Sequence, residues 1–404
     1  MKFNKPTNII LALCTAILLF GTGYKLGQYN LTSRGDSAFS FFNKTASQKN
    51  VDFSLYWETW DKLSEKYVDQ KKIDEKKLYY DSIKGMVASV GDPYTFFLTP
   101  DENKSSKDEL GGKFEGIGAQ LGLKEGKIVV IAPLKDSPAQ KIGIKAGDVI
   151  IKVDGKPTDK WTIMQAVSKI RGKGGTTVKL GIMRQDKKLS FSVVRAEIFV
   201  PTVELTYEKN VAVLKLSRFG DDTNAQWDKA ITEIEQKVQS GEVKGMVLDM
   251  RDNPGGYLQG AVYIANEFLP ADKIVVSQEY TNHPKEEYKT DRAGKLQSLP
   301  LVTLINEGSA SAAEIVAGAL KDYGKTTLVG KKSFGKGSVQ EAIDLKNGAG
   351  LHVTISKWIL PKGKWINGVG VKPDVEVENK IPEGNTLERE NDAQLEKALK
   401  EVVK

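Results

Sequence analysis

The stretch Leu301-Val-Thr-Leu-Ile-Asn-Glu-Gly-Ser-Ala-Ser-Ala-Ala-Glu314 decides the fold of this chain. Its first five residues, 301–305, are apolar or β-branched and predict a buried strand. A turn of small residues follows, and a helix is predicted from Ser311 to Tyr323. A buried strand that leads through a tight turn into a helix is typical of α/β folds, in which helices cover a sheet.

Strands and helices alternate in the same way on the N-terminal side of this stretch. They are predicted, in order, at 211–216, 227–238, 245–250 and 261–268. We therefore expect a three-layer α/β core, a mixed sheet with flanking helices, over residues 197–380. In the C-terminal segment, 381–404, Leu395, Leu399 and Val402 share one face of a predicted amphipathic helix.

Residues 111–196 predict a smaller, β-rich module. Ser137 and Pro138 are a typical N-cap and first helical residue, and Gly143 ends the short helix that they begin. Alternating apolar residues at 178–182 and 189–193 predict a hairpin. The other elements of this module are expected at 128–131, 149–153 and 163–170.

The N-terminal segment, 1–30, predicts a secretory signal or a signal anchor. Lys2 and Lys5 precede an apolar run at 9–20, and no small-x-small cleavage site ends the run. We favour an uncleaved anchor in the cytoplasmic membrane, which places the rest of the chain outside the cytoplasm, in the cell envelope. Cys14 lies within the run and is interpreted as an ordinary apolar residue.

Residues 31–110 are expected to form a tether and an N-terminal helical region. Polar residues dominate up to about residue 50. Two helices are predicted next, one beginning near Asp52 and one over 75–90 that Gly91 closes. The charged stretch 101–109 is interpreted as a linker.

Composition excludes several classes of protein. The chain has 404 residues, 40% of them hydrophobic and 27% charged, which is typical of two or three globular domains and not of a disordered chain. A single Cys excludes a disulfide framework, and with two His it leaves little material for a metal cluster, so we expect no metal and no cofactor. The net charge is +7, but the lysines are interleaved with acidic residues, so we expect a solvated surface and no nucleic-acid partner.

Ser309 and Ser311 are the candidate nucleophiles. Both lie in a turn of small residues at the start of a predicted helix, where an exposed hydroxyl has backbone N–H groups beside it. The alternative is that both are ordinary helix caps. A serine nucleophile needs a base. His283 lies in a charged stretch and His352 in an alternating strand, and neither has an obvious carboxylate to orient it, so a Ser/His/Asp triad is weakly supported.

Lys336 is the other candidate base. It lies between two glycines in Ser333-Phe-Gly-Lys-Gly-Ser-Val-Gln340, which allows close approach by another element. To act near neutral pH, its reference pKa of ~10.4 has to fall by roughly three units through burial. In an extended segment the Gln340 side chain points the same way as Lys336, and its amide could orient the amine. A phosphate-loop interpretation of 330–336 is rejected, because Gly337 stands where Ser or Thr would bind magnesium.

The segment Asp249-Met-Arg-Asp-Asn-Pro-Gly-Gly256 carries a buried strand into a tight double-glycine turn. Backbone N–H groups of Gly255 or Gly256 could stabilise a developing oxyanion. The alternative is an ordinary turn between a strand and a helix.

Two resemblances join these observations. Residues 111–196 resemble a PDZ domain, and residues 53–404 resemble the carboxy-terminal processing peptidases, also called tail-specific proteases. The first rests on Ser137-Pro-Ala, Gly143-Ile-Lys-Ala-Gly-Asp-Val-Ile150 and Val153-Asp-Gly155. The second adds Gly91-Asp-Pro-Tyr-Thr95, 249–256, Gly308-Ser-Ala-Ser-Ala312, 333–340 and Gly368-Val-Gly-Val-Lys-Pro-Asp374.

The resemblance implies a serine endopeptidase with a Ser–Lys dyad. By it, Ser311 is the nucleophile, Lys336 the general base, and Gln340 the residue that supports the lysine. The N–H of Ala312, with Gly255 or Gly256, matches the oxyanion hole, and Asp322 is expected to help to hold the local geometry. Ala313 stands where many relatives carry Ser, a change expected to be tolerated.

The PDZ resemblance implies that Gly116, Ile117, Gly118 and Ala119 bind the C-terminal tail of a protein or peptide substrate. Arg171 could steady the peptide carboxylate, although a solvated helix end is favoured for it. The terminal helices could form a homodimer. Two alternatives stay open: a PDZ protein whose protease core is silent, and a Ser/His hydrolase of small esters.

Overall fold

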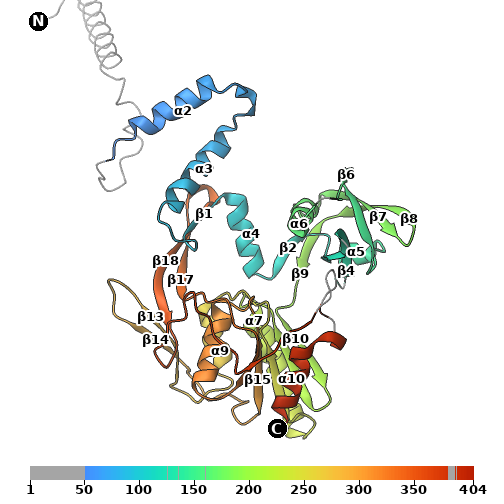
Figure 1. Ribbon diagram of the computed structural model, residues 1–404, viewed down its shortest axis with the longest axis vertical. Coiled ribbons are helices and arrows are strands. Elements are labelled where there is room, and N and C mark those ends of the chain that lie inside the picture. The colour runs from blue at the N-terminus through green and yellow to red at the C-terminus, as the bar shows by residue number, and fades with distance from the viewer. Residues whose placement is uncertain (1–50, 125, 135, 160, 381–386, 388) are drawn as a thin grey trace, which may run out of the picture. The chain divides into compact units, whose positions relative to one another are not determined.

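The computed structural model describes residues 51–124, 126–134, 136–159, 161–380, 387 and 389–404 (Figure 1). The predicted anchor at 1–30, with Cys14, and most of the predicted tether lie outside these residues. Among the described residues, none of the helices combines the length and the apolar character that a membrane crossing requires.

The described residues fall into two compact units, one ending at Leu78 and the other spanning Tyr79–Lys404. The first unit contains helix α2 (Ser54–Lys66) and the short helix η1 (Gln70–Lys72). Aromatic rings of Phe53, Tyr56 and Trp60 contact one another along α2. Helix α3 (Glu75–Ala88) begins in this unit, so both predicted N-terminal helices are present.

The core of the second unit is a six-stranded sheet in the order β10-β11-β12-β15-β16-β19. All neighbours are parallel except β10, which is antiparallel to β11. The strands are β10 (Val203–Glu208), β11 (Val211–Leu216), β12 (Gly245–Asp249), β15 (Leu301–Ile305), β16 (Thr327–Gly330) and β19 (Val375–Glu376). This arrangement confirms the α/β core with a mixed sheet that the alternating pattern predicts.

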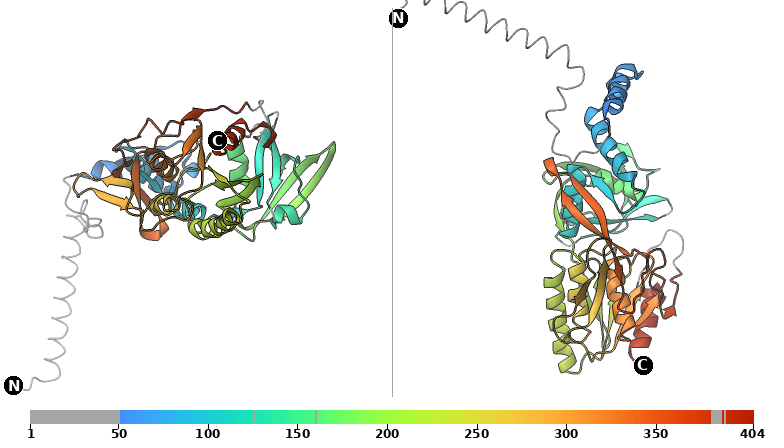
Figure 2. Two further views of the ribbon diagram at one scale, coloured as in Figure 1. Left: turned by 90° about the horizontal axis from the view of Figure 1, so that it is seen from below. Right: turned by 90° about the vertical axis from the view of Figure 1, so that its left-hand side faces the viewer.

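Helices cover both faces of this sheet (Figure 2). Leu214 and Leu248 point to the face packed by α7 (Thr223–Gln239), α8 (Leu258–Ala265) and α9 (Ala312–Asp322). Val213 and Val247 point to the opposite face, where Leu395 and Val402 of α10 (Ala393–Val402) pack against them. Side chains alternate along each strand, so one buried strand serves two apolar layers.

A second sheet carries the segment around Lys336. Its order is β1-β18-β13-β14, and β17 pairs with β18. The strands are β1 (Phe96–Leu98), β13 (Ile274–Glu279), β14 (Glu286–Lys289), β17 (Ser338–Asp344) and β18 (Gly350–Ile359). The short helix η2 (Lys346–Gly348) lies between β17 and β18, whereas η3 (Arg389–Asn391) precedes α10 in the sequence.

The β-rich module forms a sheet in the order β3-β4-β5-β7-β8, with β6 paired to β5. A separate two-stranded sheet pairs β2 with β9. The elements are β2 (Lys113–Gly116), β3 (Ala119–Lys124), β4 (Lys127–Pro133), α5 (Pro138–Lys141), β5 (Val149–Val153), β6 (Lys156–Pro157), α6 (Ile163–Ile170), β7 (Thr177–Arg184), β8 (Lys187–Val194) and β9 (Ala196–Phe199). Ser137 caps α5 as predicted, since its hydroxyl accepts from the Gln140 N–H at 3.2 Å.

The interpretation of 101–109 as a linker is wrong, because this stretch forms helix α4 (Pro100–Leu110). Thr99 and Glu102 form a reciprocal capping box, and Pro100 occupies the first helical position. Asn103 is buried and donates to Asp344 and to the Gly348 carbonyl at 3.1 Å. The charged composition of this stretch resembles that of a linker, although it carries helix caps and a buried asparagine that bonds to other segments.

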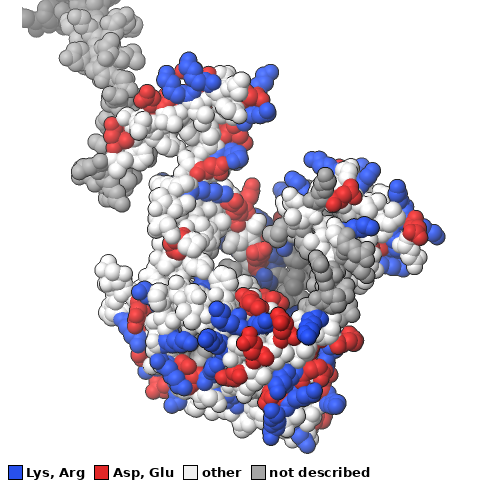
Figure 3. All heavy atoms as spheres, viewed as in Figure 1, with Lys and Arg blue, Asp and Glu red and all other residues white. Residues whose placement is uncertain are grey.

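Charged side chains of both signs are mixed over the face shown in Figure 3. On that face, blue and red groups alternate over the core instead of forming one basic stripe. This distribution agrees with the predicted solvated surface.

Candidate active site

Ser311 stands in a strained turn between β15 and α9. Its φ and ψ are 53° and −117°, in a region that non-glycine residues rarely adopt. Such a conformation costs roughly 1–3 kcal/mol and persists only where the surroundings enforce it. The side chain is half-buried, whereas Ala312 and Ala313, which follow it, are fully buried.

Glu314 holds this turn from inside the protein. The residue has no exposed surface, and its Oε2 accepts from the Ser311 N–H at 2.8 Å and the Lys336 N–H at 2.9 Å. Its Oε1 accepts from the Gly335 N–H at 2.7 Å and the Ser333 hydroxyl at 2.5 Å. One carboxylate therefore joins the serine turn to the backbone of the lysine loop.

Burial and hydrogen bonding act on Glu314 in opposite directions. Burial raises the pKa of Glu314, and the bonds from Ser333, Lys336, Gly335 and Ser311 lower it, with a net rise. Both partners of Oε2 are N–H donors, so a proton on Oε2 would displace one of them, whereas on Oε1 the Ser333 hydroxyl can turn and accept.

Lys336 lies in the loop before β17 with its amine partly withdrawn from water. Burial lowers the pKa of Lys336, and the charges of Asp92 and Glu314 oppose that shift. Its Nζ lies 5.1 Å from the centroid of the Tyr94 ring. Within the described residues the amine makes no hydrogen bond or ion pair, so it is not bonded to Ser311 in this structure.

Gln340 does not contact the amine by hydrogen bonding. Its Nε2 donates to the Ser338 hydroxyl at 2.9 Å and to the Thr354 hydroxyl at 3.0 Å. A register shift between Val339 and Gln340 interrupts the pairing of β17 with β18. Such a bulge breaks the simple alternation from which a common direction for Lys336 and Gln340 was expected.

The double-glycine turn lies directly against Ser311. A side chain at Gly255 would come within 2.7 Å of the Ser311 Cβ and 3.0 Å of the Ala312 nitrogen, so only glycine fits there. The Gly255 N–H donates to the Asn253 side chain at 2.9 Å. In the described part of the chain, the N–H groups of Gly256 and Ala312 donate to no other group. The structure thus brings Gly255, Gly256 and Ala312 together around Ser311.

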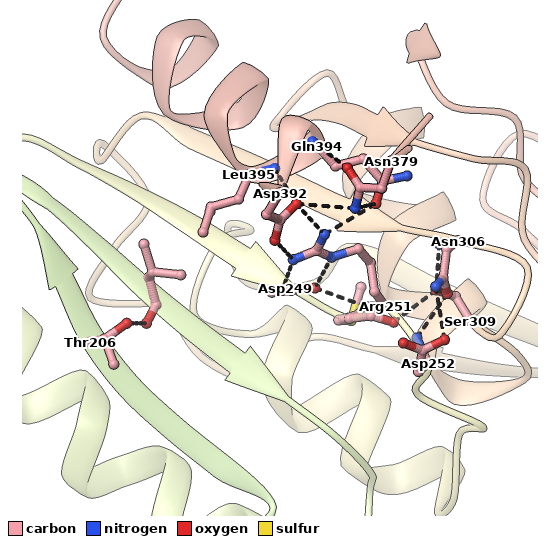
Figure 4. Close-up of polar contacts among 12 residues, drawn as sticks. Thr206, Asp249, Arg251, Asp252, Asn306, Ser309, Asn379, Asp392, Gln394 and Leu395 are labelled. Carbon is pink, nitrogen blue, oxygen red and sulfur yellow. Dashed lines mark hydrogen bonds and ion pairs between the residues drawn. The ribbon is translucent and has the colours of Figure 1, made fainter. Parts of the chain in front are cut away.

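Hydrogen bonds lock the glycine turn to the serine turn (Figure 4). The Asp252 N–H donates to Asn306 Oδ1, and Asn306 Nδ2 donates back to Asp252, both at 2.8 Å. Ser309 is fully buried, and its hydroxyl donates to the Met250 carbonyl at 2.8 Å and accepts from the Asn306 N–H at 2.9 Å. Because the Ser309 hydroxyl is buried and already forms these hydrogen bonds, Ser311 is the accessible serine of the turn.

Arg251 anchors the same turn to the C-terminal helix (Figure 4). Its guanidinium donates to Asp249 at 2.6 and 2.9 Å and to Asp392 at 2.8 Å. All three side chains are at most 8% exposed. Asp392 also caps α10 by accepting from the Leu395 N–H at 3.0 Å. The predicted C-terminal helix is therefore fastened to the strand that leads into the glycine turn.

The candidate peptide-binding loop lies at an edge of the β-rich module. Gly116 ends β2, Ala119 begins β3, and β3 is an outer strand of its sheet. Gly118 has a φ of +71°, and a side chain there would come within 2.4 Å of the Ser137 Cβ. Ile117 is 2% exposed and packs in the module core. Arg171 lies over the Phe114 ring and contacts Glu109 at 3.3 Å.

Among the described residues, neither histidine forms a hydrogen bond with the serine turn. His352, in β18, stacks on Phe96 with ring centroids 4.7 Å apart, and His283 contacts the Tyr280 ring. Burial and the nearby charge of Lys336 lower the pKa of His352. Asp322, at the end of α9, accepts from the Lys362 N–H at 3.0 Å.

Comparison with known proteins gives the family. A model of peptidase family S41 matches residues 210–377, and a PDZ domain model matches residues 116–194. The carboxy-terminal processing protease CtpA of Bacillus subtilis is 37% identical over 374 residues, covering 92% of this chain and 76% of that protein. The chain belongs to peptidase family S41.

Two further similarities agree with this assignment. CtpB of Bacillus subtilis, also a carboxy-terminal processing protease, is 35% identical over 378 residues, covering 91% of this chain and 77% of that protein. The structure of a photosystem II D1 C-terminal processing protease is 29% identical with a TM-score of 0.50, covering 81% of this chain and 89% of that one. This S41 peptidase is therefore a serine-type peptidase with a PDZ domain, as the sequence resemblance implied.

The family matches fall inside the predicted domains at 111–196 and 197–380, whose limits stay predictions. Sequence reasoning missed Glu314. Its position three residues after Ser311 is the Ser-x-x-Glu pattern of a capping box, which could have indicated a bond to the serine backbone. Its bonds to the lysine loop join segments about twenty residues apart, and no local pattern predicts those.

Proposed function

We propose that this S41 peptidase is an exported endopeptidase that cleaves protein substrates with a Ser311–Lys336 dyad after its PDZ domain has bound their C-terminal tails. The observation that carries the proposal is Glu314. A single buried carboxylate oxygen accepts from the backbone of both Ser311 and Lys336, and so it joins the nucleophile's turn to the loop of the base.

In the proposed reaction the neutral Lys336 amine removes the proton of the Ser311 hydroxyl as Oγ attacks the scissile carbonyl carbon. The carbonyl oxygen becomes an oxyanion next to the N–H groups of Ala312 and of Gly255 or Gly256. In this structure Gly256 is the glycine whose N–H is not already engaged, since that of Gly255 donates to Asn253.

The tetrahedral intermediate then breaks its C–N bond, and the Lys336 ammonium gives its proton to the leaving amine. Water attacks the acyl-enzyme, the amine accepts its proton, and the serine is restored. The contact between Ser311 and Lys336 forms in the substrate complex, as catalytic hydrogen bonds often do. Partial burial of Lys336 supports its role, because it lowers the pKa and favours the neutral amine.

The PDZ domain supplies the substrate class in this proposal. Edge strand β3 can pair with an extended tail, while the Gly116–Ala119 loop binds the terminal carboxylate. The names of the Bacillus relatives, carboxy-terminal processing proteases, support tails as substrates. Extracytoplasmic location, anchoring through the N-terminal segment and assembly as a homodimer belong to the same proposal.

The test is cleavage of an unfolded protein with an apolar C-terminus by the full chain, comparing wild type with Ser311→Ala, Lys336→Ala and Ser309→Ala. We expect Ser311→Ala and Lys336→Ala to lose at least roughly 10³-fold in rate. Ser309→Ala is the matched control, and it is expected to lose stability but keep measurable cleavage. Cleavage by Ser311→Ala would overturn the proposed nucleophile, and tail binding with no turnover in wild type would indicate a silent core.

A further inference from the structure

None of the proposed reaction steps uses the motif Gly91-Asp-Pro-Tyr-Thr95. It forms the turn between α3 and β1, with Gly91 at a φ of +77°. The Asp92 carboxylate accepts from the Tyr94 N–H at 3.1 Å and from the Thr95 hydroxyl at 2.7 Å. These bonds fix the direction in which the Tyr94 side chain leaves the turn.

The motif is also bonded to the hairpin that follows Lys336. Thr354 in β18 donates its hydroxyl to Asp92 at 2.5 Å, and its N–H donates to the Thr95 hydroxyl at 3.1 Å. Beside them, β1 pairs with β18 through Phe96 and His352. A turn that lies more than 200 residues earlier in the sequence is thereby held against β18.

Two contacts lead from this turn to the proposed catalytic lysine. The Tyr94 ring lies 5.1 Å from Lys336 Nζ, within the range of a cation–π contact. The Thr354 hydroxyl that donates to Asp92 also accepts from Gln340 Nε2 at 3.0 Å. The chain Asp92–Thr354–Gln340 therefore orients the amide that follows the lysine loop.

Four groups interact with the Lys336 amine: the Tyr94 ring, which lies beside it, and the carboxylates of Asp92 and Glu314 and the imidazole of His352, which act through their charges. Although burial raises it, the hydrogen bonds from Thr354, Thr95 and Tyr94 and the charge of Lys336 lower the pKa of Asp92 below its ordinary value. Asp92 is therefore a negative charge at neutral pH, whereas His352 is neutral because its pKa is lowered.

We propose that Asp92 and Tyr94 are positioning residues for the general base: Tyr94 supports the Lys336 amine, and Asp92 fixes Tyr94 and Gln340 while supplying the negative charge that favours the protonated amine. This inference rests on the proposed role of Lys336 and adds a reason for the motif that precedes β1. Asp92 and Tyr94 stabilise the amine while it is protonated. This is the interval after the proton has left Ser311 and before it reaches the leaving group.

The sign of the charge effect follows from the geometry. An opposite charge near the amine stabilises its protonated form and raises its pKa. Removal of the Asp92 charge therefore lowers the pKa of Lys336, and the neutral amine becomes available at lower pH. The acidic limb of the pH profile of kcat/KM moves to lower pH, not to higher.

The principal variant is Asp92→Asn in the full chain. The Thr95 and Thr354 hydroxyls can accept as well as donate, so an amide can keep the contacts without the charge. We expect the acidic limb of kcat/KM to move down by about one pH unit. Asp344→Asn is the matched control, because this exposed carboxylate on β17 pairs with Lys107 and does not face the amine, so its profile stays unchanged.

A second pair of variants tests the ring. Tyr94→Phe keeps the ring beside the amine, and its kcat is expected to stay within about twofold of wild type. Tyr94→Leu removes the ring, and kcat is expected to fall roughly 10-fold with little change in KM, because the misplaced base acts after binding. Equal activity of the two variants, or a loss confined to KM, overturns the positioning role of Tyr94.

A direct titration separates this inference from the proposed function. In Ser311→Ala protein with carbon-13 lysine, the ε-methylene resonance of Lys336, assigned by its loss in Lys336→Met, reports the pKa of the amine. A fall of about one unit in Asp92→Asn supports the inference, and an unchanged value overturns it. Undiminished cleavage by Lys336→Ala would instead overturn the proposed function, whatever the titration shows.

Discussion

Two buried hydrogen-bond networks built on carboxylates lie on opposite sides of the same sheet. They differ in the charge of the groups that bond to the carboxylates. On one side, Asp249 and Asp392 flank the Arg251 guanidinium under α10 (Figure 4). On the other, Glu314 accepts only from neutral groups, three backbone N–H groups and the hydroxyl of Ser333. The first network therefore contains ion pairs, whereas the hydrogen bonds of the second come from neutral donors.

The pKa shifts follow this difference. Burial raises the pKa of both carboxyl groups, but hydrogen bonds and the charge of Arg251 lower that of Asp392 below its ordinary value, whereas that of Glu314 ends above it. A paired network fastens one element to another and contributes to stability. A carboxylate among neutral donors fixes the positions of those donors, here the backbones of Ser311 and Lys336. We therefore expect the first network to act on stability and the second on the geometry of the proposed catalytic residues.

The largest effect is expected at Glu314. In Glu314→Gln, one carboxylate oxygen becomes an NH₂ group. In place of Oε1 it faces the Gly335 N–H, which loses its acceptor, and the Ser333 hydroxyl, which has to turn and accept. In place of Oε2 it faces the N–H groups of Ser311 and Lys336, which both lose their acceptor. We expect cleavage to fall about 10²–10³-fold, since in either orientation a buried N–H of the serine turn or of the lysine loop loses its acceptor and the two segments shift. The rate on an unfolded substrate and the unfolding midpoint are measured on the same protein.

Glu341→Gln is the matched control for this substitution, because Glu341 is exposed on β17. It is expected to change neither measurement. A Glu314→Gln protein that loses stability but keeps its rate would show that Glu314 acts as the Arg251 network does, and the contrast between the two networks would fail.

Arg251→Met is expected to act on stability. It leaves Asp249 and Asp392 buried without their cation, which costs about 3–5 kcal/mol of unfolding free energy. Folded protein is expected to keep its cleavage rate within about threefold, because the bonds from Asp252 and Ala310 still hold the glycine turn to the serine turn. Urea unfolding at neutral pH gives the first quantity and initial rates well below the midpoint give the second.

Lys397→Met provides the comparison on the same helix. Lys397 pairs with Glu401 on the surface of α10, and loss of an exposed pair of this kind costs about 0.3–0.5 kcal/mol. A cost as small as this for Arg251→Met would mean that the buried cation contributes no more than a surface one.

Among the residues of the two networks the smallest effect is expected at Asp392, and it depends on pH. The folded-state pKa of Asp392 is lowered, so its contribution to stability is present above the unfolded pKa of about 3.9 and is lost as pH falls through the folded value. We expect Asp392→Asn to cost about 1–2 kcal/mol at pH 7 and progressively less as pH falls below the unfolded pKa of about 3.9. Urea unfolding of wild type and Asp392→Asn at pH 7 and at a pH below about 3.9 checks this. A difference in unfolding free energy that is the same at both pH values would contradict it.

Sequence patterns predicted the elements that carry the site, because their causes are local. The apolar run at 301–305, the small turn and the helix that follows appear as β15 and α9 within one residue. The cap at Ser137 and the helix end at Gly143 depend on neighbouring residues and were likewise predicted. Helix α4 was not predicted, because its charged composition resembles that of a linker and its helical character depends on the capping residues at its start.

The candidate site itself was predicted only in part. The nearness of Gly255 to Ser311 follows from two strand ends that meet at one edge of the sheet. The direction of Gln340 could not be predicted, since a bulge after Val339 changes which way its side chain points. The contacts of Glu314 and Asp92 could not be predicted from the sequence, because each carboxylate accepts hydrogen bonds from distant segments of the chain.

The sequence by itself determined the family, the order of strands and helices, and the turns that carry Ser311, Lys336 and the two glycines, because apolar periodicity, caps and glycine positions act over a few residues. The tertiary structure decided which groups surround them. Glu314 reaches the lysine loop, Arg251 reaches α10, and Asp92 reaches Thr354 only after the sheets have fixed their registers. The physical reason is that a hydrogen bond requires atoms within about 3 Å, and distant segments attain that precision only through packing of the whole unit.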